Sequence, residues 1–132
     1  MRVLALDYGS ARCGCAVSDP TETIVTPINP VPRPASKRGM LALAQLVRER
    51  EVARVVVGLP LSLSGQDTPQ TTEARAFARR LADRLGPGIL VEMHDERFTT
   101  LLARRSADGA SAGEDSRAAA HLLEGWLASR ER

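Results

Sequence analysis

The first third of the chain is dominated by short apolar runs separated by turn residues. Residues 2–7 and 12–18 have the length and composition of buried strands, and residues 8–10 are typical of the turn between them. A third short strand is expected from Thr23 to Ile28. Prolines at positions 27, 30, 32 and 34 then predict an extended connection rather than the interior of a strand. This part of the chain therefore predicts a meander of three strands.

Helical and strand-like patterns alternate in the rest of the chain. Apolar residues spaced three and four apart predict a helix that begins at Ser36 and a second helix capped by Thr68, with Pro69 in its first position. Strands are expected at 52–57 and 89–94, a short helix at 100–106, a loop at 107–114, and a last helix with a buried face formed by Ala119, Leu122, Leu123 and Trp126. Strands joined through helices run parallel in one sheet. The pattern predicts an α/β fold with a mixed five-stranded sheet and helices packed on it.

Length, charge and cysteine content add a few constraints. A chain of 132 residues suits a single domain covering residues 1–132. The net charge of +2, from 18 basic and 16 acidic residues, is compatible with a polyanion partner and equally with a solvated surface. Cys13 and Cys15 are awkwardly close for a disulfide and are interpreted as reduced core residues. No apolar run reaches the ~20 residues that span a bilayer, and no secretion signal is recognisable, so we expect a cytoplasmic protein without a membrane segment.

Four acidic residues occupy positions that packing alone does not explain. Asp7 ends one apolar strand, and Asp95 and Glu96 end another. Asp115 lies four residues before Ala119, so helical periodicity directs it toward the sheet. Carboxylates gathered in a partly buried site are costly unless a cation neutralises them. Mg²⁺ or Mn²⁺, which prefer oxygen ligands, fits such a site, and two-metal hydrolysis of phosphodiesters is the chemistry that it would support.

Each acid also has a purely structural interpretation. Asp7 could begin an Asx-turn, and Asp115 could cap the last helix. Asp95 or Glu96 could pair with Arg97 at the surface. All of these interpretations together are less economical than one site, because the acids share one end of the sheet.

The segments around these acids resemble four motifs of the YqgF/RuvX family. The opening motif of the family is similar to Asp7-Tyr8-Gly9 together with Arg12, Gly14 and residues 16–19. The second motif is similar to residues 56–60 together with Gly65. Residues 95–100 (Asp-Glu-Arg-Phe-Thr-Thr) are similar to the most specific signature of the family. Asp115-Ser116 with Ala118-Ala119 is similar to its closing motif. The resemblance runs from residue 2 to about residue 127, nearly the whole chain.

The resemblance implies an RNase H-like fold, which Holliday junction resolvases share, and a metal-dependent nuclease. Members of the family are described as nucleases for the 5′ end of pre-16S rRNA, and some as enzymes that resolve branched DNA. The expected partner is therefore nucleic acid, either pre-ribosomal RNA or branched or single-stranded DNA. The family's catalytic, metal-binding acids correspond to Asp7, Glu96 and Asp115. Asp95 and Glu96 would point to opposite faces of an extended chain, so one of them is expected to bind metal, and the resemblance favours Glu96.

Residues near the acids are candidates for substrate binding. Arg12 and Arg97 are candidate phosphate contacts, although ion pairs with the same acids are an equal alternative. Ser10 and Ala11 stand where the family usually has Thr and Lys, which removes one phosphate contact. Ser62 stands where Asn is usual, and the loop before the last helix lacks the usual basic residues. These departures affect substrate preference more than the metal site.

Two other functions compete with a nuclease. An ATP-binding protein of the actin, Hsp70 and sugar-kinase class needs two such domains, whereas this chain has room for one and lacks a Walker-type glycine-rich loop. A non-catalytic ribosome-assembly factor could keep the fold without activity, but the retained acids argue against it. The sequence leaves open RNA or DNA as substrate, Mg²⁺ or Mn²⁺ as cofactor, endonuclease or exonuclease action, and monomer or homodimer.

Overall fold

A mixed sheet organises the chain, which was analysed as a computed structural model. The structure describes residues 1–96 and 113–130, with Glu114 and Asp115 described by their helical backbone. In chain order the elements are β1 (Arg2–Asp7), β2 (Arg12–Ser18), β3 (Val25–Pro32), α1 (Lys37–Glu49), β4 (Val52–Leu59), α2 (Pro69–Leu85), β5 (Leu90–Asp95) and α4 (Glu114–Arg130). The predicted short helix at 100–106 and most of the loop before the last helix lie outside the described residues.

The sheet has five strands in the order β3-β2-β1-β4-β5. Neighbours run antiparallel from β1 through β2 to β3, whereas β1 pairs parallel with β4, and β4 with β5. The crossovers through α1 and α2 impose the parallel pairs, as the alternation of helices and strands predicts. The predicted mixed five-stranded sheet is therefore confirmed.

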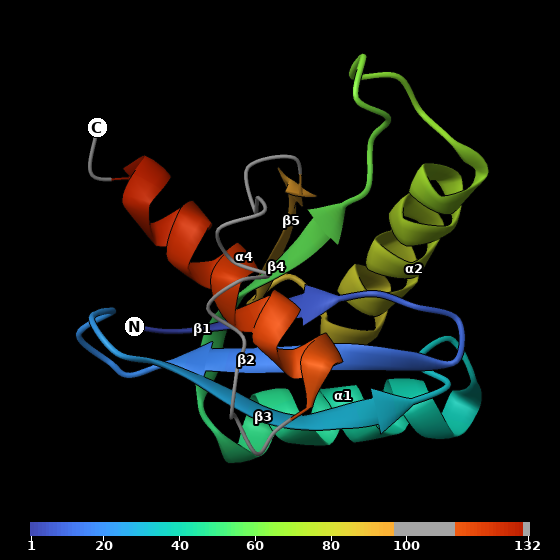
Figure 1. Ribbon diagram of the computed structural model, residues 1–132. Coiled ribbons are helices and arrows are strands. Elements are labelled where there is room, and N and C mark those ends of the chain that lie inside the picture. The colour runs from blue at the N-terminus through green and yellow to red at the C-terminus, as the bar shows by residue number, and fades with distance from the viewer. Residues whose placement is uncertain (97–112, 131–132) are drawn as a thin grey trace.

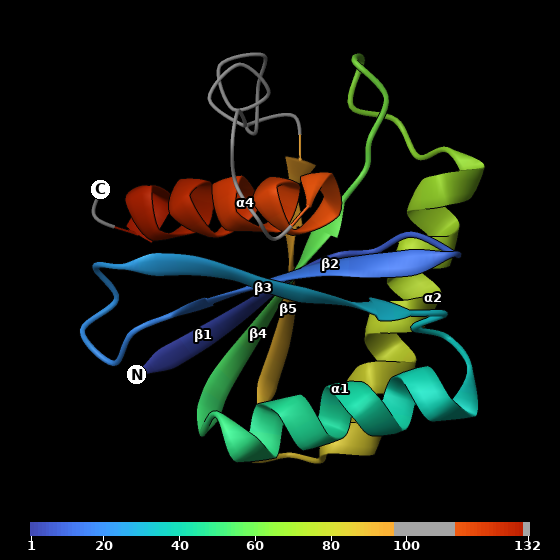
Figure 2. The same ribbon diagram turned by 60° about the horizontal axis from the view of Figure 1, so that its bottom comes forward.

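Helices cover both faces of this sheet, with α4 on one face and α1 and α2 on the other (Figures 1 and 2). Successive residues of β1 enter the two resulting cores in turn. Leu4 and Leu6 pack in the core that includes α1 and α2, and Val3 and Ala5 pack in the core that includes α4. All four side chains are fully buried. The alternation of β1 thereby fixes which face each later residue of this strand meets.

The helix starts agree with the sequence prediction. The Ser36 hydroxyl caps α1 by accepting a hydrogen bond from Gly39 N–H at 3.0 Å. Thr68 caps α2 in the same way, Pro69 follows in the first turn, and Thr71 closes a reciprocal capping box. Each cap satisfies amide groups that have no partner within the helix. The predicted apolar faces of α1, α2 and α4 are the buried ones.

The prediction for the proline-rich segment is wrong. Instead of ending at Ile28, β3 continues to Pro32 and includes Pro27 and Pro30. The reason is its position, because β3 is an edge strand with β2 as its one neighbour. An edge strand tolerates residues without an amide hydrogen on its open side, whereas an interior strand does not.

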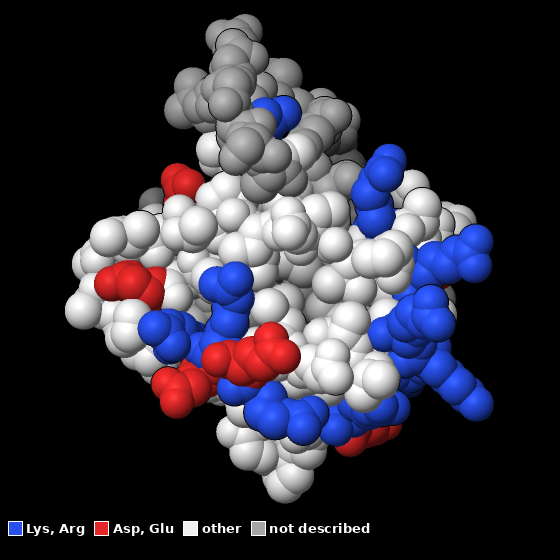
Figure 3. Space-filling view, turned by 90° about the horizontal axis from the view of Figure 1, so that it is seen from below, with Lys and Arg blue, Asp and Glu red and all other residues white. Residues whose placement is uncertain are grey.

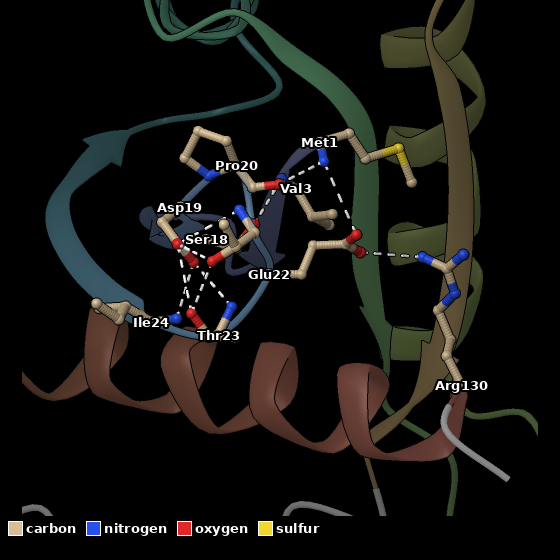
Figure 4. Close-up of polar contacts among 10 residues, drawn as sticks. Met1, Val3, Ser18, Asp19, Pro20, Glu22, Thr23, Ile24 and Arg130 are labelled. Carbon is tan, nitrogen blue, oxygen red and sulfur yellow. Dashed lines mark hydrogen bonds and ion pairs between the residues drawn. The ribbon is translucent and has the colours of Figure 1, made fainter.

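The turn between β2 and β3 is built around the Asp19 carboxylate (Figure 4). It accepts hydrogen bonds from the Thr21 hydroxyl and from the amides of Ile24, Thr23 and Thr21, and these bonds, that of the hydroxyl first, hold the pKa of Asp19 well below its usual range. The prediction of a turn role for Asp19 is confirmed. Nearby, Glu22 bonds to Arg130 at 3.2 Å and so links this turn to the end of α4. Among residues 1–96 and 113–130, no helix is long and apolar enough to cross a membrane.

Candidate active site

The parallel strands β1, β4 and β5 end at the same edge of the sheet, and acidic residues collect there. Asp7 is the last residue of β1, and Glu96 directly follows β5. Between these two strands lies the end of β4, where Gly58 pairs with His94 and Leu59 with Asp95. The sheet topology thus brings together two acids that are 89 positions apart in the sequence.

Strand alternation places Asp7 on the α4 face of the sheet. Val3 and Ala5 face the α4 core, so Asp7 continues the same side of β1. On β4, Val56 belongs to the α4 core while Val55 and Val57 belong to the other core, so Gly58 also lies on the α4 face. The site therefore lies on the same side of the sheet as α4.

Glycine makes the space in which the two acids meet. The Glu96 carboxyl lies against Gly58, where an added Cβ would come within 2.8 Å of Glu96 Cδ and closer still to Oε1. On the other side of Asp7, the paired residue in β2 is Gly14. A side chain at position 58 would displace the Glu96 carboxyl. The glycine in the run Val57-Gly58-Leu59 is therefore what gives this carboxyl its place in the site.

The carboxyl groups of Glu96 and Asp7 are joined by a hydrogen bond, so they share a proton between them. Burial raises the pKa of Glu96 to about 9, and the hydrogen bond and negative charge of Asp7, followed by the charge of Asp95, add to this effect. At neutral pH the pair thus carries one negative charge fewer than its two carboxyls could carry. A cation that bound to both carboxyls could therefore replace this proton.

Asp95 faces the opposite side of the sheet from Glu96. Val91 and Met93 pack against the core of α1 and α2, and Asp95 continues their side of β5. This position agrees with the expectation that one of the two adjacent acids enters the site. Asp95 acts on Glu96 through its charge.

The other predicted site residues are only partly placed. Asp115 lies in the first turn of α4, on the face of the sheet where Asp7 lies, and its side chain is not among the described groups. Arg12 is exposed at the start of β2. Arg97 lies outside the described residues. Within residues 1–96 and 113–130, no group of three His, Cys, Asp or Glu side chains forms a metal-binding cluster, so the convergence of all three acids stays a prediction.

The described part of the site fits a hard divalent cation. Its donors are carboxylate oxygens, which Mg²⁺ and Mn²⁺ prefer. Two carboxyls that must share a proton when buried together gain the most from a cation that replaces it. Asp7 and Glu96 would hold such an ion, with Asp115 as the third candidate ligand.

The anchor of α4 is Ser116, a role that the sequence pattern did not indicate. This side chain is fully buried, and its hydroxyl accepts a hydrogen bond from Cys15 N–H at 3.3 Å and donates one to the Ile28 carbonyl. Cys15 and Ile28 face each other across β2 and β3, beside an irregularity in the pairing between Cys13 and Cys15. The hydroxyl thus bridges two backbone groups of neighbouring strands. It fixes the start of α4, and with it the backbone of Asp115, relative to the sheet.

Several polar and aromatic residues have structural roles instead. Trp126 is buried in the α4 core, as predicted, with the Arg54 guanidinium 5.6 Å from its ring centre. His94 packs near Gly125 of α4, and burial lowers its pKa. Cys13 and Cys15 are buried and form no disulfide, so the predicted core position of both is confirmed.

Comparison with known proteins decides the family. A family model described as "RuvX: Holliday junction resolvase" matches residues 1–129. The chain belongs to this family. The resemblance predicted from the motifs around Asp7, Glu96 and Asp115 is thus confirmed.

Curated members of the RuvX family are similar along the whole chain. A protein of Corynebacterium jeikeium is 37% identical over 138 residues, covering 99% of this chain and 88% of the relative. One from Anaeromyxobacter dehalogenans is 40% identical over 137 residues, covering 98% of each. Both carry the name "Putative pre-16S rRNA nuclease".

Solved structures confirm the fold of this RuvX family member. The RuvC structure of Thermus thermophilus has a TM-score of 0.66 at 12% identity, covering 99% of this chain and 96% of that chain. A Fowlpox virus resolvase, solved with Holliday junction DNA, has a TM-score of 0.62 at 12% identity and full coverage of both chains. The predicted RNase H-like fold is confirmed.

Substitution of Gly58 by Ala should impair the site and spare the fold. The new methyl group pushes the Glu96 carboxyl away from Asp7, and a misplacement of about 1 Å can cost roughly a hundredfold in rate. Because a flexible side chain absorbs the clash, the melting temperature should change little. Cleavage rates and thermal melts of Gly58→Ala should be compared with Gly88→Ala, where an added Cβ meets nothing within 4 Å. Equal activity of both variants would contradict the position assigned to Glu96.

Protein stability without divalent ions should fall as the pH rises from 7 to 9. The pKa of Glu96 is raised from 4.5 to about 9 in the folded state, so folding favours the protonated form and this contribution disappears as the pH approaches 9. His94, whose pKa is lowered, titrates below this window. Urea unfolding in EDTA at several pH values measures the effect. Glu96→Gln should show a smaller fall, and an identical fall in wild type and variant would count against the shared proton.

Removal of the Ser116 hydroxyl should destabilise the whole fold. Ser116→Ala leaves buried backbone groups of Cys15 and Ile28 without their bridge, at a cost of about 1–3 kcal/mol in the free energy of unfolding. Ser129→Ala is the matched control, because its hydroxyl bonds within the exposed end of the same helix. That control should stay within about 0.5 kcal/mol of wild type. Similar losses in urea unfolding for both variants would show that the bridge is not an anchor.

Proposed function

We propose that this chain is a divalent-metal-dependent nuclease that processes the 5′ end of pre-16S rRNA, with Asp7, Glu96 and Asp115 as its catalytic metal ligands. The nuclease class, a hydrolase of phosphodiester bonds, follows from family membership. The assignment of these acids and of Mg²⁺ or Mn²⁺ is our proposal. The observation that supports it best is the hydrogen-bonded pair of Asp7 and Glu96 against Gly58.

The residues of the pair have different tasks in this proposal. Asp7 ends a buried central strand and pairs with Gly14 on β2, so its position is fixed by the sheet. Glu96 holds the shared proton, and as a metal ligand it would act in its deprotonated form. A bound divalent ion would supply Lewis-acid stabilisation of the phosphate and activation of the attacking water. Asp115, in the first turn of α4, is the third proposed ligand.

The substrate assignment follows the relatives. Curated members at 37% and 40% identity, with nearly complete coverage of this chain, carry the pre-16S rRNA nuclease name. Ribosome biogenesis is therefore the process in which we place this chain. We expect it to act in the cytoplasm, where the buried Cys13 and Cys15 would stay reduced.

Cleavage of branched DNA is the second candidate, favoured by the description of the matching family as a Holliday junction resolvase. A four-way junction presents two equivalent strands, so an enzyme acting on it would pair two active sites by two-fold symmetry. This candidate therefore requires a homodimer, whereas trimming of a single RNA end does not. Mass in solution and cleavage of RNA and junction substrates separate the two candidates.

Substitution of Asp7 by Asn should abolish metal-dependent cleavage and leave the fold intact. Asn keeps the shape of the side chain but loses the charge that holds the ion, so the rate should fall at least about a hundredfold. The substrates are an RNA spanning the 5′ end of pre-16S rRNA, single-stranded DNA and a four-way DNA junction, each with Mg²⁺ or Mn²⁺. Wild type should cut the RNA fastest.

Thermal melts with and without the ion provide a reading that does not depend on activity. At a concentration ~100 times its dissociation constant, the ion should stabilise wild type by about 2.7 kcal/mol and Asp7→Asn by much less. Asp67→Asn is the control, because Asp67 is exposed and bonds to Arg75 at 3.2 Å. A stabilisation that persists in Asp7→Asn would place the ion elsewhere.

A further inference from the structure

Basic side chains lie exposed beside the end of the sheet that carries Asp7. They are Arg12 at the start of β2, Arg33 in the turn after β3, and Lys37 and Arg38 in the first turn of α1. We call these four residues the basic strip. Viewed from below, Lys and Arg side chains gather on the right-hand side of the molecule, the side on which α1 begins and α2 lies in Figure 1 (Figure 3).

Backbone contacts link the segments that carry the strip to the end of β1. Gly14 pairs with Asp7, and Arg12, two residues earlier, pairs with Pro32. Arg33 N–H donates to the Ala11 carbonyl at 2.9 Å, and the Arg33 carbonyl accepts from Ser36 N–H at 3.0 Å. The turn after β1, the end of β3 and the start of α1 thus lie at the end of the sheet where β1 ends in Asp7, with α1 on the face opposite the carboxyl pair.

The strip has an unusual charge pattern. The sequence contains no Asp or Glu between Asp7 and Asp19, and none between Glu22 and Glu49. Within the described part of the chain, the side chains of Arg33, Lys37 and Arg38 form no ion pair. Four other arginines form such pairs, namely Arg2 with Glu51, Arg54 with Glu92, Arg75 with Asp67 and Arg130 with Glu22. Arg48, Arg50 and Arg84 form none with the described groups, but they lie close in sequence to Glu49, Glu51 and Asp83. The positive charges at positions 33, 37 and 38 are therefore not neutralised by the described protein groups.

This arrangement opposes the stability of α1. The first turn of a helix carries a partial positive charge and favours acidic residues, yet that of α1 has none and contains Lys37 and Arg38. Arg33 has a left-handed backbone conformation, with φ of 43°, which residues other than glycine rarely adopt. Such conflicts between local preference and the fold are expected where function requires them. A polyanion lying on the strip would reverse the unfavourable electrostatics.

We propose that the basic strip binds the phosphate backbone of the RNA strand that leads to the carboxyl pair. The proposal rests on the proposed nuclease function and extends the substrate path beyond Arg12 to Arg33, Lys37 and Arg38. Arg and Lys at successive positions along a surface contact phosphates without reading the bases. The strip would therefore hold and orient the strand while the acids act on one of its bonds.

Binding of the RNA fragment in EDTA tests the proposal, because cleavage cannot then interfere. The triple variant Arg33→Gln, Lys37→Gln, Arg38→Gln should bind at least about tenfold more weakly, and the slope of log affinity against log salt should become shallower by about 2, or ~0.7 for each phosphate that is no longer neutralised. Its melting temperature should equal or exceed that of wild type, since like charges leave the start of α1. The double variant at Lys37 and Arg38 keeps the Arg33 turn and should show about two-thirds of this slope change.

The matched control removes three charges at the opposite end of α1 and α2. Arg48 and Arg84 line a groove between these helix ends, and Arg50 caps α1. The variant Arg48→Gln, Arg50→Gln, Arg84→Gln should bind RNA like wild type. Equal losses in the strip and control variants, or wild-type binding by both strip variants, would overturn the proposal.

Two further outcomes separate the hypotheses. A loss of binding confined to four-way junction DNA, with RNA binding unchanged, would overturn the assignment of RNA to the strip. Wild type that binds RNA through the strip but never cleaves it with Mg²⁺ or Mn²⁺ would support the strip and contradict the proposed nuclease mechanism.

Discussion

The contact between the carboxyl groups of Asp7 and Glu96 is the constraint on which the site depends. Burial disfavours the charged form of Glu96, and its hydrogen bond with Asp7 and the charge of Asp7 add to this effect, so the pKa of Glu96 rises to about 9. The protein brings them together because the parallel strands β1 and β5 end at one edge, and because Gly58 leaves room between them. A carboxyl that is held protonated in the absence of a cation is well suited to bind one.

The rest of the fold serves to keep this contact in place. Alternation along β1 and β4 puts Asp7 and Gly58 on the face that α4 covers, while apolar residues of the same strands fill the two cores. The Ser116 hydroxyl, inserted between Cys15 and Ile28, holds the first turn of α4 on the sheet. Through this bridge the backbone of Asp115 has a fixed relation to β2, and β2 in turn pairs with Asp7 through Gly14.

Much of the fold could be predicted from local chemistry. Caps at Ser36 and Thr68, and the β-branched run that becomes β4, depend on near neighbours and were identifiable from the sequence. The extent of β3 was not, because prolines exclude an interior strand but permit an edge strand, and edge position is a property of the whole sheet. Asp7 and Glu96 were found as acids that end apolar strands and through the family motifs. The role of Ser116, the space at Gly58 and the assembly of the basic strip depend on contacts between distant segments, which no local pattern reports.

Diffraction from crystals soaked in Mn²⁺, measured for its anomalous signal, tests the central claim most directly. We predict a peak within ~2.1 Å of carboxylate oxygens of both Asp7 and Glu96, on the α4 face of the sheet and next to Gly58. The same soak of Asp7→Asn should lose the peak. An ion bound elsewhere, with the Asp7 and Glu96 carboxyls still hydrogen-bonded to each other, would contradict the claim that this pair is the metal centre.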